Sequence, residues 1–205
     1  MSEHCCAPSA RTHGDRYRKV LWFALAVNAA MFMVEIAASA WSGSASLAAD
    51  ALDFLGDTGN YAASLAAIAL GGAWRSRVAL TKGAVMGVYG ATALAYAGWR
   101  AWLGSPPEPL TMGVVGFAAL VANAGVAVAL FAFRNGDANM RSVWLCTRND
   151  IIGNLAVLLA AAGVLGTRSV WPDVAVAVVI AALGISAART VVAAARAELG
   201  RPVSG

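Results

Sequence analysis

Long apolar stretches separated by short polar connections make up most of the chain. Each stretch reaches the roughly 20 residues that a helix needs to cross a bilayer. The connections hold turn-forming sequences such as Trp41-Ser-Gly-Ser and Gly104-Ser-Pro-Pro. The pattern predicts an all-α polytopic membrane protein with six transmembrane helices, at residues 20–41, 45–70, 78–103, 112–133, 140–165 and 170–195.

The composition agrees with this pattern. Of the 205 residues, 60% are hydrophobic and only 13% are charged, and the mean hydropathy is +0.66. Soluble domains carry about 25% charged residues. A soluble globular fold of this size is therefore excluded, because its surface would lack charge.

The six stretches divide the chain into three parts. Residues 1–19 form a polar tail that we expect to be flexible, residues 20–196 form the six-helix transmembrane domain, and residues 197–205 form a short C-terminal tail. The first apolar stretch is longer than the core of a signal peptide and lacks a small-residue cleavage site after it. We therefore interpret it as a retained span.

Basic residues predict the orientation. Positive charge concentrates on the cytoplasmic side of membrane proteins. The basic residues at one side of the predicted spans are Arg11, Arg16, Arg18, Lys19, Arg75, Arg77, Lys82, Arg134, Arg141, Arg189, Arg196 and Arg201. The other side has Arg100 and Arg168. Both termini are therefore expected in the cytoplasm, and the net charge of +4 reflects orientation and attraction to anionic lipid, with no nucleic acid as a partner.

Three of the predicted spans carry polar residues near the middle of the membrane. A charged side chain there costs about 2.5–3.5 kcal/mol on insertion scales. Such residues are tolerated when they face protein, water or a cation, so they indicate a functional site. The residues concerned are Asn28, Glu35, Asp50, Asp53, Asp57, Cys146, Arg148, Asn149, Asp150 and Asn154.

Spacing and depth indicate one shared site. Asp53 and Asp57 are four residues apart, as are Cys146 and Asp150, so each pair lies on one helix face. Asp57 and Asp150 each lie about 15 Å from the end at which their span enters, near the middle of a core of about 30 Å. Two helices that run in opposite directions therefore bring two pairs of ligands to one level.

Three carboxylates and one thiolate suit a divalent transition metal. Zn²⁺ binds Cys sulfur and Asp oxygen, and the soft sulfur disfavours Mg²⁺ and Ca²⁺, whereas Cd²⁺ fits at least as well. These ligands lose protons when they bind metal, which supplies a route to proton exchange. Taken alone, Cys146 is also compatible with simple core packing.

The other polar residues have supporting interpretations. Asp50 is expected to anchor a hydrogen bond near the outer interface, and Asn154 continues the face of Asp150. Glu35 and Asn28 share one face of the first span, where Glu35 could gate entry, relay protons or pack a polar seam. Asp173 is expected to cap the helix that it starts. In the tail, His4, Cys5 and Cys6 could capture metal, or be incidental to an unstructured terminus.

Two segments resemble motifs of the cation diffusion facilitator family. Ser44-Ala-Ser-Leu-Ala-Ala-Asp50-Ala-Leu-Asp53-Phe-Leu-Gly-Asp57 resembles the motif of the second helix, and Cys146-Thr-Arg-Asn-Asp150-Ile-Ile-Gly-Asn154 resembles that of the fifth. Asn28 and Glu35 resemble a polar pair of the first helix. The resemblance implies a dimeric, proton-coupled exporter of Zn²⁺ or related metals, with ligands Asp53, Asp57 and Asp150. The resemblance also implies that the protein lies in the cell membrane, which in a bacterium would be the inner membrane.

This sequence departs from the family pattern at two places. The fourth ligand position usually holds His and here holds Cys146, which bears on metal selectivity. The cytosolic C-terminal domain of most members is also missing, so we expect a short form whose dimer rests on the membrane helices.

Other functions remain open from the sequence. A proton-coupled exporter of organic cations would need an aromatic-lined cavity, but the two site-bearing spans contain few aromatic residues. An enzyme is not expected, since the only histidines lie in the tail and no prosthetic group is indicated. A membrane metal sensor without transport is a further alternative.

Overall fold

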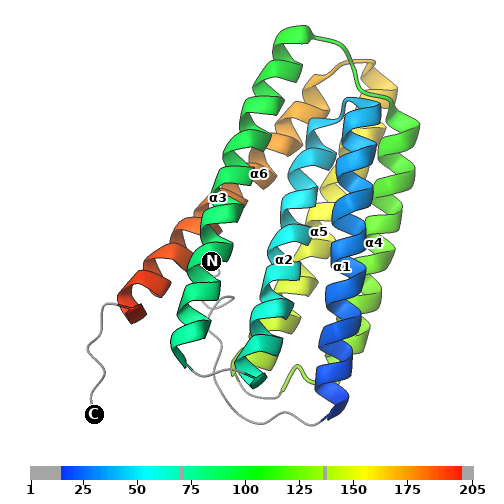
Figure 1. Cartoon of the computed structure of the whole chain (residues 1–205). Coiled ribbons are helices and arrows are strands. Elements are labelled where there is room, and N and C mark those ends of the chain that lie inside the picture. The colour runs from blue at the N-terminus through cyan, green and yellow to red at the C-terminus, as the bar shows by residue number, and fades with distance from the viewer. Residues whose placement is uncertain (1–14, 70–71, 136–137, 200–205) are drawn as a thin grey trace.

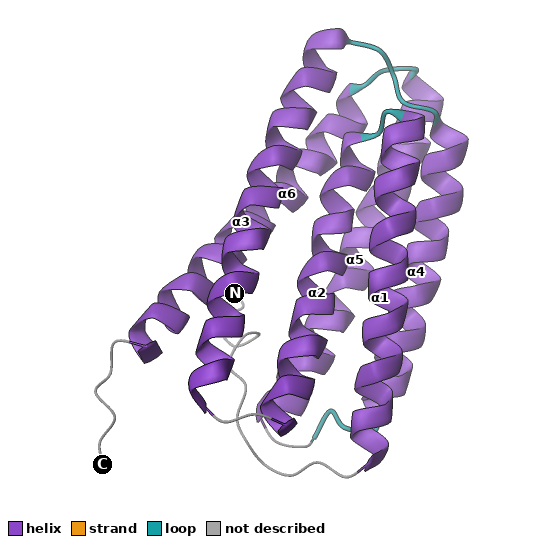
Figure 2. Ribbon diagram, in the orientation of Figure 1, coloured by secondary structure: helices purple, strands orange, loops and turns teal. Residues whose placement is uncertain are grey.

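Six long helices joined by short connections make up the described structure (Figures 1 and 2). The computed structural model describes residues 15–69, 72–135 and 138–199, although some side chains within these helices are not described. The helices are α1 (Asp15–Ser42), α2 (Ala45–Ala69), α3 (Gly72–Leu103), α4 (Pro109–Phe131), α5 (Ala138–Thr167) and α6 (Trp171–Leu199). The predicted all-α class is confirmed. Each predicted stretch corresponds to one helix, although α4 ends at Phe131, two residues before the predicted bound, and α6 begins at Trp171, one residue after it.

Four helices are apolar enough to cross a membrane by length and composition. They are α1, α4, the Asp150–Thr167 part of α5 and the Trp171–Ala193 part of α6. Among the described residues, α2 and α3 do not meet that criterion. Three aspartates lie within α2, and basic residues lie in the first turns of α3. Six spans and the placement of both termini remain predictions from the sequence.

The helices fall into a four-helix group and a pair. α1, α2, α4 and α5 pack side by side, and α3 packs along α6 (Figure 1). The pair contacts the group chiefly through α2. We call the end of the molecule with the α1–α2, α3–α4 and α5–α6 connections the α1–α2 end, and the opposite end the α2–α3 end. This arrangement gives α2 contacts with α1, α3, α5 and α6.

The outward surface is apolar and the interior contains polar groups. Val128 and Leu159 are 76% and 72% exposed, whereas Glu35 and Asp50 are fully buried. At the α1–α2 end, Trp41 and Trp102 are more than four-fifths exposed. Tryptophans near helix ends are typical of the interface between membrane and water. The distribution is that of a protein whose surroundings are lipid.

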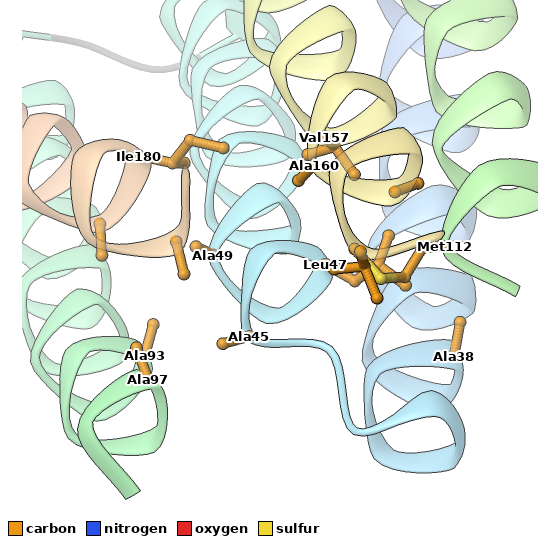
Figure 3. Packing of buried hydrophobic residues seen from close by; sticks show 14 residues of the cluster. Ala38, Ala45, Leu47, Ala49, Ala93, Ala97, Met112, Val157, Ala160 and Ile180 are labelled. Carbon is orange, nitrogen blue, oxygen red and sulfur yellow. The ribbon is translucent and has the colours of Figure 1, made fainter. Parts of the chain in front are cut away.

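Small side chains fill the core near the α1–α2 end. Figure 3 shows Ala45, Ala49, Ala93 and Ala97 on α2 and α3 together with Ile180 on α6. Alanines allow helix backbones to approach closely, and close contact is the main source of helix association inside a bilayer. The contact of α2 with the α3–α6 pair is therefore built on backbone proximity.

Asp173 corrects one expectation from the sequence. It caps a helix, but that helix is α2 and not its own. Its carboxylate accepts hydrogen bonds from the backbone N–H groups of Ala45 (2.7 Å) and Ser46 (2.9 Å), and from the Ser44 hydroxyl (2.7 Å). The N-termini of α2 and α6 lie at the same end of the molecule. The buried Asp173 carboxylate on α6 can therefore accept hydrogen bonds from N–H groups in the first turn of α2, which have no partner within their own helix.

Glu108 caps α4. Its carboxylate accepts hydrogen bonds from the backbone N–H groups of Leu110 (3.0 Å) and Thr111 (2.6 Å), and Pro109 follows in the first turn, where its fixed φ suits a helix start. The hydroxyl and N–H of Thr111 lower the pKa of Glu108. Because the folded-state pKa is lowered, the cap stabilises the helix at neutral pH and is lost as the pH falls through that lowered value.

Gly184 allows α6 to lie against α2. A Cβ at this position would collide with Leu52. We therefore expect Gly184→Ala to lower the free energy of unfolding by about 1–3 kcal/mol, the usual cost of overpacking. Thermal unfolding in detergent would measure the change.

Gly113→Ala is the matched control for this substitution. Within 4 Å of a Cβ at Gly113 there are no described atoms other than those of its own helix. This variant should lose no stability. Adding Leu52→Val to Gly184→Ala removes the colliding methyl group and should recover part of the loss. Equal stability of Gly184→Ala and Gly113→Ala would contradict the close contact.

Candidate metal site

The three aspartates of α2 lie along one side of the helix. Asp50 is fully buried, Asp57 is 6% exposed, and Asp53 between them is half-buried. Successive members are three and four residues apart, so they follow one face of the helix. This acidic stripe turns toward the interior of the four-helix group, where Asp50 and Asp57 are buried.

Asp150 on α5 meets this stripe. Its carboxyl group lies within hydrogen-bonding reach of the Asp57 carboxyl group, and the charges of Asp53 and Asp50 also act on it. Gly153, one turn further along α5, lies beside the stripe: a Cβ there would make ordinary van der Waals contacts with Asp53 Oδ2 (3.4 Å) and Asp50 Oδ1 (3.7 Å). The structure therefore brings together Asp53, Asp57 and Asp150 from two antiparallel helices.

Tyr61 orients Asp57. The Tyr61 hydroxyl donates to Asp57 Oδ2 (2.8 Å) and lies 2.7 Å from the Thr147 hydroxyl on α5. Tyr61 and Thr147 are both buried, and Tyr61 packs with Leu21, Val126 and other apolar residues. A hydrogen-bonded bridge from α2 to α5 thus closes the site on the side nearer the α2–α3 end.

A second series of polar side chains links four helices. Asn123 on α4 donates to Asn154 Oδ1 on α5 (2.9 Å), and Asn154 donates to Asp50 Oδ2 on α2 (2.8 Å). The free side of Asp50 faces Glu35 on α1. Asp50 therefore accepts a hydrogen bond from Asn154, and its role as an anchor stays a prediction. Asn28 is not part of this series, because its amide donates to the backbone oxygen of Ala24 in its own helix (2.8 Å).

Several predicted site residues lie outside the described part of the structure. The Cys146 position is within α5, but its side chain is not described, and His4, Cys5 and Cys6 belong to the undescribed N-terminal segment. Among the side chains that are described, no three His, Cys, Asp or Glu residues already form a set that could hold a metal ion. The participation of Cys146 stays a prediction.

Sequence reasoning missed three residues that contact the predicted site. Tyr61 lies one turn beyond Asp57, Thr147 directly follows Cys146, and Asn123 is a buried amide in an otherwise apolar span. The signal for Asn123 was present, since an amide within a span needs a partner. Hydroxyl groups such as Thr147 give no comparable signal, because they can bond to their own helix backbone.

Removing the Tyr61 hydroxyl tests its role at the site. Tyr61→Phe keeps the buried ring but leaves Asp57 Oδ2 without this donor. We expect the affinity for Zn²⁺ or Cd²⁺ to fall by about 10-fold, because loss of a partner that orients a metal ligand costs about 10–100-fold. Equilibrium metal titration of the purified protein would measure the change.

Tyr96→Phe provides the control, since it also removes a tyrosine hydroxyl. Its ring on α3 packs beside Trp99 (5.9 Å between centroids) and against the apolar cluster near the α1–α2 end. Metal affinity should be unchanged in this variant. Thr147→Val should show a smaller loss than Tyr61→Phe. An unaltered affinity in Tyr61→Phe would mean that this bond does not orient a metal ligand.

Comparison with known protein families agrees with the site. Residues 21–199 match the family model described as the cation efflux transmembrane domain, which covers all six helices except the first turns of α1. No curated protein sequence matches the chain.

Proposed function

The chain belongs to the cation efflux family, a family of multi-pass membrane proteins that transport metal cations, and we propose that it exports Zn²⁺ or Cd²⁺ in exchange for protons. The proposed ligands are Asp53 and Asp57 on α2 with Cys146 and Asp150 on α5. Under this proposal all six helices span the membrane, both termini are cytoplasmic, and the ion moves from the cytoplasm outward. The chain acts as a carrier and not as an enzyme.

One observation supports this proposal most strongly. The carboxyl groups of Asp57 and Asp150 meet in the interior although they come from different helices. Like charges at such short range repel, and the repulsion is largest away from water. Bringing them together is a cost to folding that a bound divalent cation offsets. A purely structural role would be served better by neutral residues.

Proton exchange follows from the ligand chemistry. Carboxylates that share a buried site hold protons when no metal is present and release them when metal binds. If the ion leaves on the outer side, protons from that side can take its place. Alternating access of one site to the two faces then couples the two flows.

The surroundings are proposed from the sequence and the family. Cytoplasmic basic residues suit a membrane with anionic lipid, and a bacterial inner membrane is the proposed location. A homodimer held by membrane helices is the proposed assembly.

Flux into proteoliposomes tests the function. Protein is reconstituted in vesicles that contain a zinc-sensitive dye, and a pH gradient with the acidic side inside is imposed. External Zn²⁺ or Cd²⁺ should enter vesicles in which the cytoplasmic face points outward, and the rate should fall when an ionophore dissipates the gradient.

Three results would count against the proposal. Metal flux that does not depend on the pH gradient would refute proton coupling but not metal transport. Metal binding without any flux would favour a sensor, and proton-driven efflux of a lipophilic organic cation without metal flux would favour the organic-cation carrier.

A further inference from the structure

Glu35 and Asp50 form a carboxyl pair next to the proposed metal site, on the side of the α1–α2 end. Asp50 precedes Asp53 by three residues and Asp57 by seven on α2, which is about 5 Å and about 10 Å along the helix axis. Glu35 approaches Asp50 from α1. Both residues are 0% exposed. The pair lies between the proposed metal site and the α1–α2 end.

The two carboxyl groups meet without a donor between them. Neither Oε1 nor Oε2 of Glu35 receives a hydrogen bond from the described residues, and the same holds for Asp50 Oδ1. When both groups are ionised, their contact is acceptor to acceptor. The pair is stable in an apolar interior when the two groups share a proton or when a cation stands between the oxygens.

The described protein supplies no such ion to Glu35. The charges that act on Glu35 are those of Asp50 and Asp53, both acidic. Tyr89, whose ring packs against Phe32 beside Glu35 on α1, donates its hydroxyl to the backbone oxygen of Ala48 (2.9 Å). None of the described side chains supplies positive charge to Glu35, so a cation from outside would stabilise the pair in its ionised form.

Asp50 is held with one oxygen available. The Asn123–Asn154 chain fixes its other oxygen, Oδ2, through the 2.8 Å bond from the Asn154 amide. Gly153 keeps a side chain away from Oδ1, because a Cβ there would lie 3.7 Å from it. Asp50 Oδ1 receives no hydrogen bond from the described residues, so it is available to a ligand.

We propose that Glu35 and Asp50 bind a divalent metal cation and form a second station for the transported ion. The proposal rests on the proposed export function. All available ligand atoms are oxygens and only two side chains provide them, so water must complete the coordination and binding is weaker than at a site with a thiolate. Weak binding suits a station that an ion must leave again.

Metal stoichiometry tests the second station. The protein is purified as the full chain with Cys5→Ser and Cys6→Ser, so that the tail thiols bind nothing, and is titrated with Cd²⁺. We expect a tight equivalent with a thiolate-to-cadmium ultraviolet band from Cys146, and a second equivalent at least 10-fold weaker without such a band. Glu35→Gln should abolish the second equivalent and leave the band unchanged.

Two further variants make the test robust. Asp50→Asn should repeat the loss even if Glu35→Gln fails to fold. Glu108→Gln is the matched control: it makes the same change at an exposed carboxylate that caps α4, and it should keep both equivalents.

The outcomes distinguish failure of the second station from failure of the proposed export function. If the parent protein transports metal and Glu35→Gln binds as many equivalents as the parent, the second station is wrong and export stands. If Glu35→Gln retains its metal stoichiometry but titrates one proton fewer, the pair holds a proton only, and the proposal is overturned. If the parent shows neither flux nor the thiolate band, the export function itself fails.

Discussion

Asp57→Asn and Asp150→Asn are each expected to lower metal efflux by about 100-fold or more. Asparagine keeps the size of aspartate but loses the charge that binds the cation. Loss of even an orienting partner costs about 10–100-fold in affinity, so loss of a ligand should cost at least the upper part of that range. Initial rates in proteoliposomes would measure the effect.

Stability distinguishes a ligand from a structural residue in these variants. Asp57 and Asp150 repel when both are charged, so an amide at either position should leave the metal-free protein as stable as the parent or more stable. Adding Zn²⁺ should raise the melting temperature of the parent and not of the variants. Asp15→Asn, at an exposed carboxylate in the first turn of α1, is the control that should transport normally. Parental flux in both site variants would refute the site.

Substitution of Cys146 is expected to change which metal is preferred. Cys146→Ser replaces a soft sulfur by a hard oxygen, which weakens binding of Cd²⁺ more than that of Zn²⁺. The ratio of Cd²⁺ to Zn²⁺ affinity should fall by at least about 10-fold, an effect comparable to loss of an ordinary metal partner. Cys146→His should keep transport and move the preference toward Zn²⁺. Competition titrations of both variants against the parent would give the ratios.

The tail thiols supply the control for this experiment. Cys5→Ser with Cys6→Ser should leave the selectivity of transport unchanged, because these residues precede the first helix. If the parent, Cys146→Ser and Cys146→His all prefer the same metals with equal affinity, Cys146 is not a ligand and the site has three carboxylates.

Much of the fold follows from the sequence because its signals are local. Runs of apolar residues determine the six helices, and Gly43, which has a positive φ of 71°, ends α1 where the sequence places a turn. The pairing of Asp57 with Asp150 could also be predicted. Both residues lie at mid-depth in antiparallel spans, and both require a polar environment, so one shared site was the simplest arrangement.

The remaining contacts depend on how the helices rotate against one another. The hydrogen bonds from Asn123 to Asn154 and from Asn154 to Asp50 join three helices. No periodicity within one helix specifies which amide will face which carboxylate. The same holds for Asp173, because its partner is set by the placement of two helix N-termini side by side. Gly184 could be recognised as small, but its contact with Leu52 depends on the crossing of α6 over α2.

The position of the Asp173 bonds also determines how α6 can move. Three hydrogen bonds on one carboxylate attach the first turn of α6 to the first turn of α2 at the α1–α2 end. A rod that is fixed at one end can only swing about that end. While these bonds hold, any displacement of α6 from α2 grows with distance from Asp173. Asp173 is thus a pivot, and the α2–α3 end is where the α3–α6 pair has the largest possible travel.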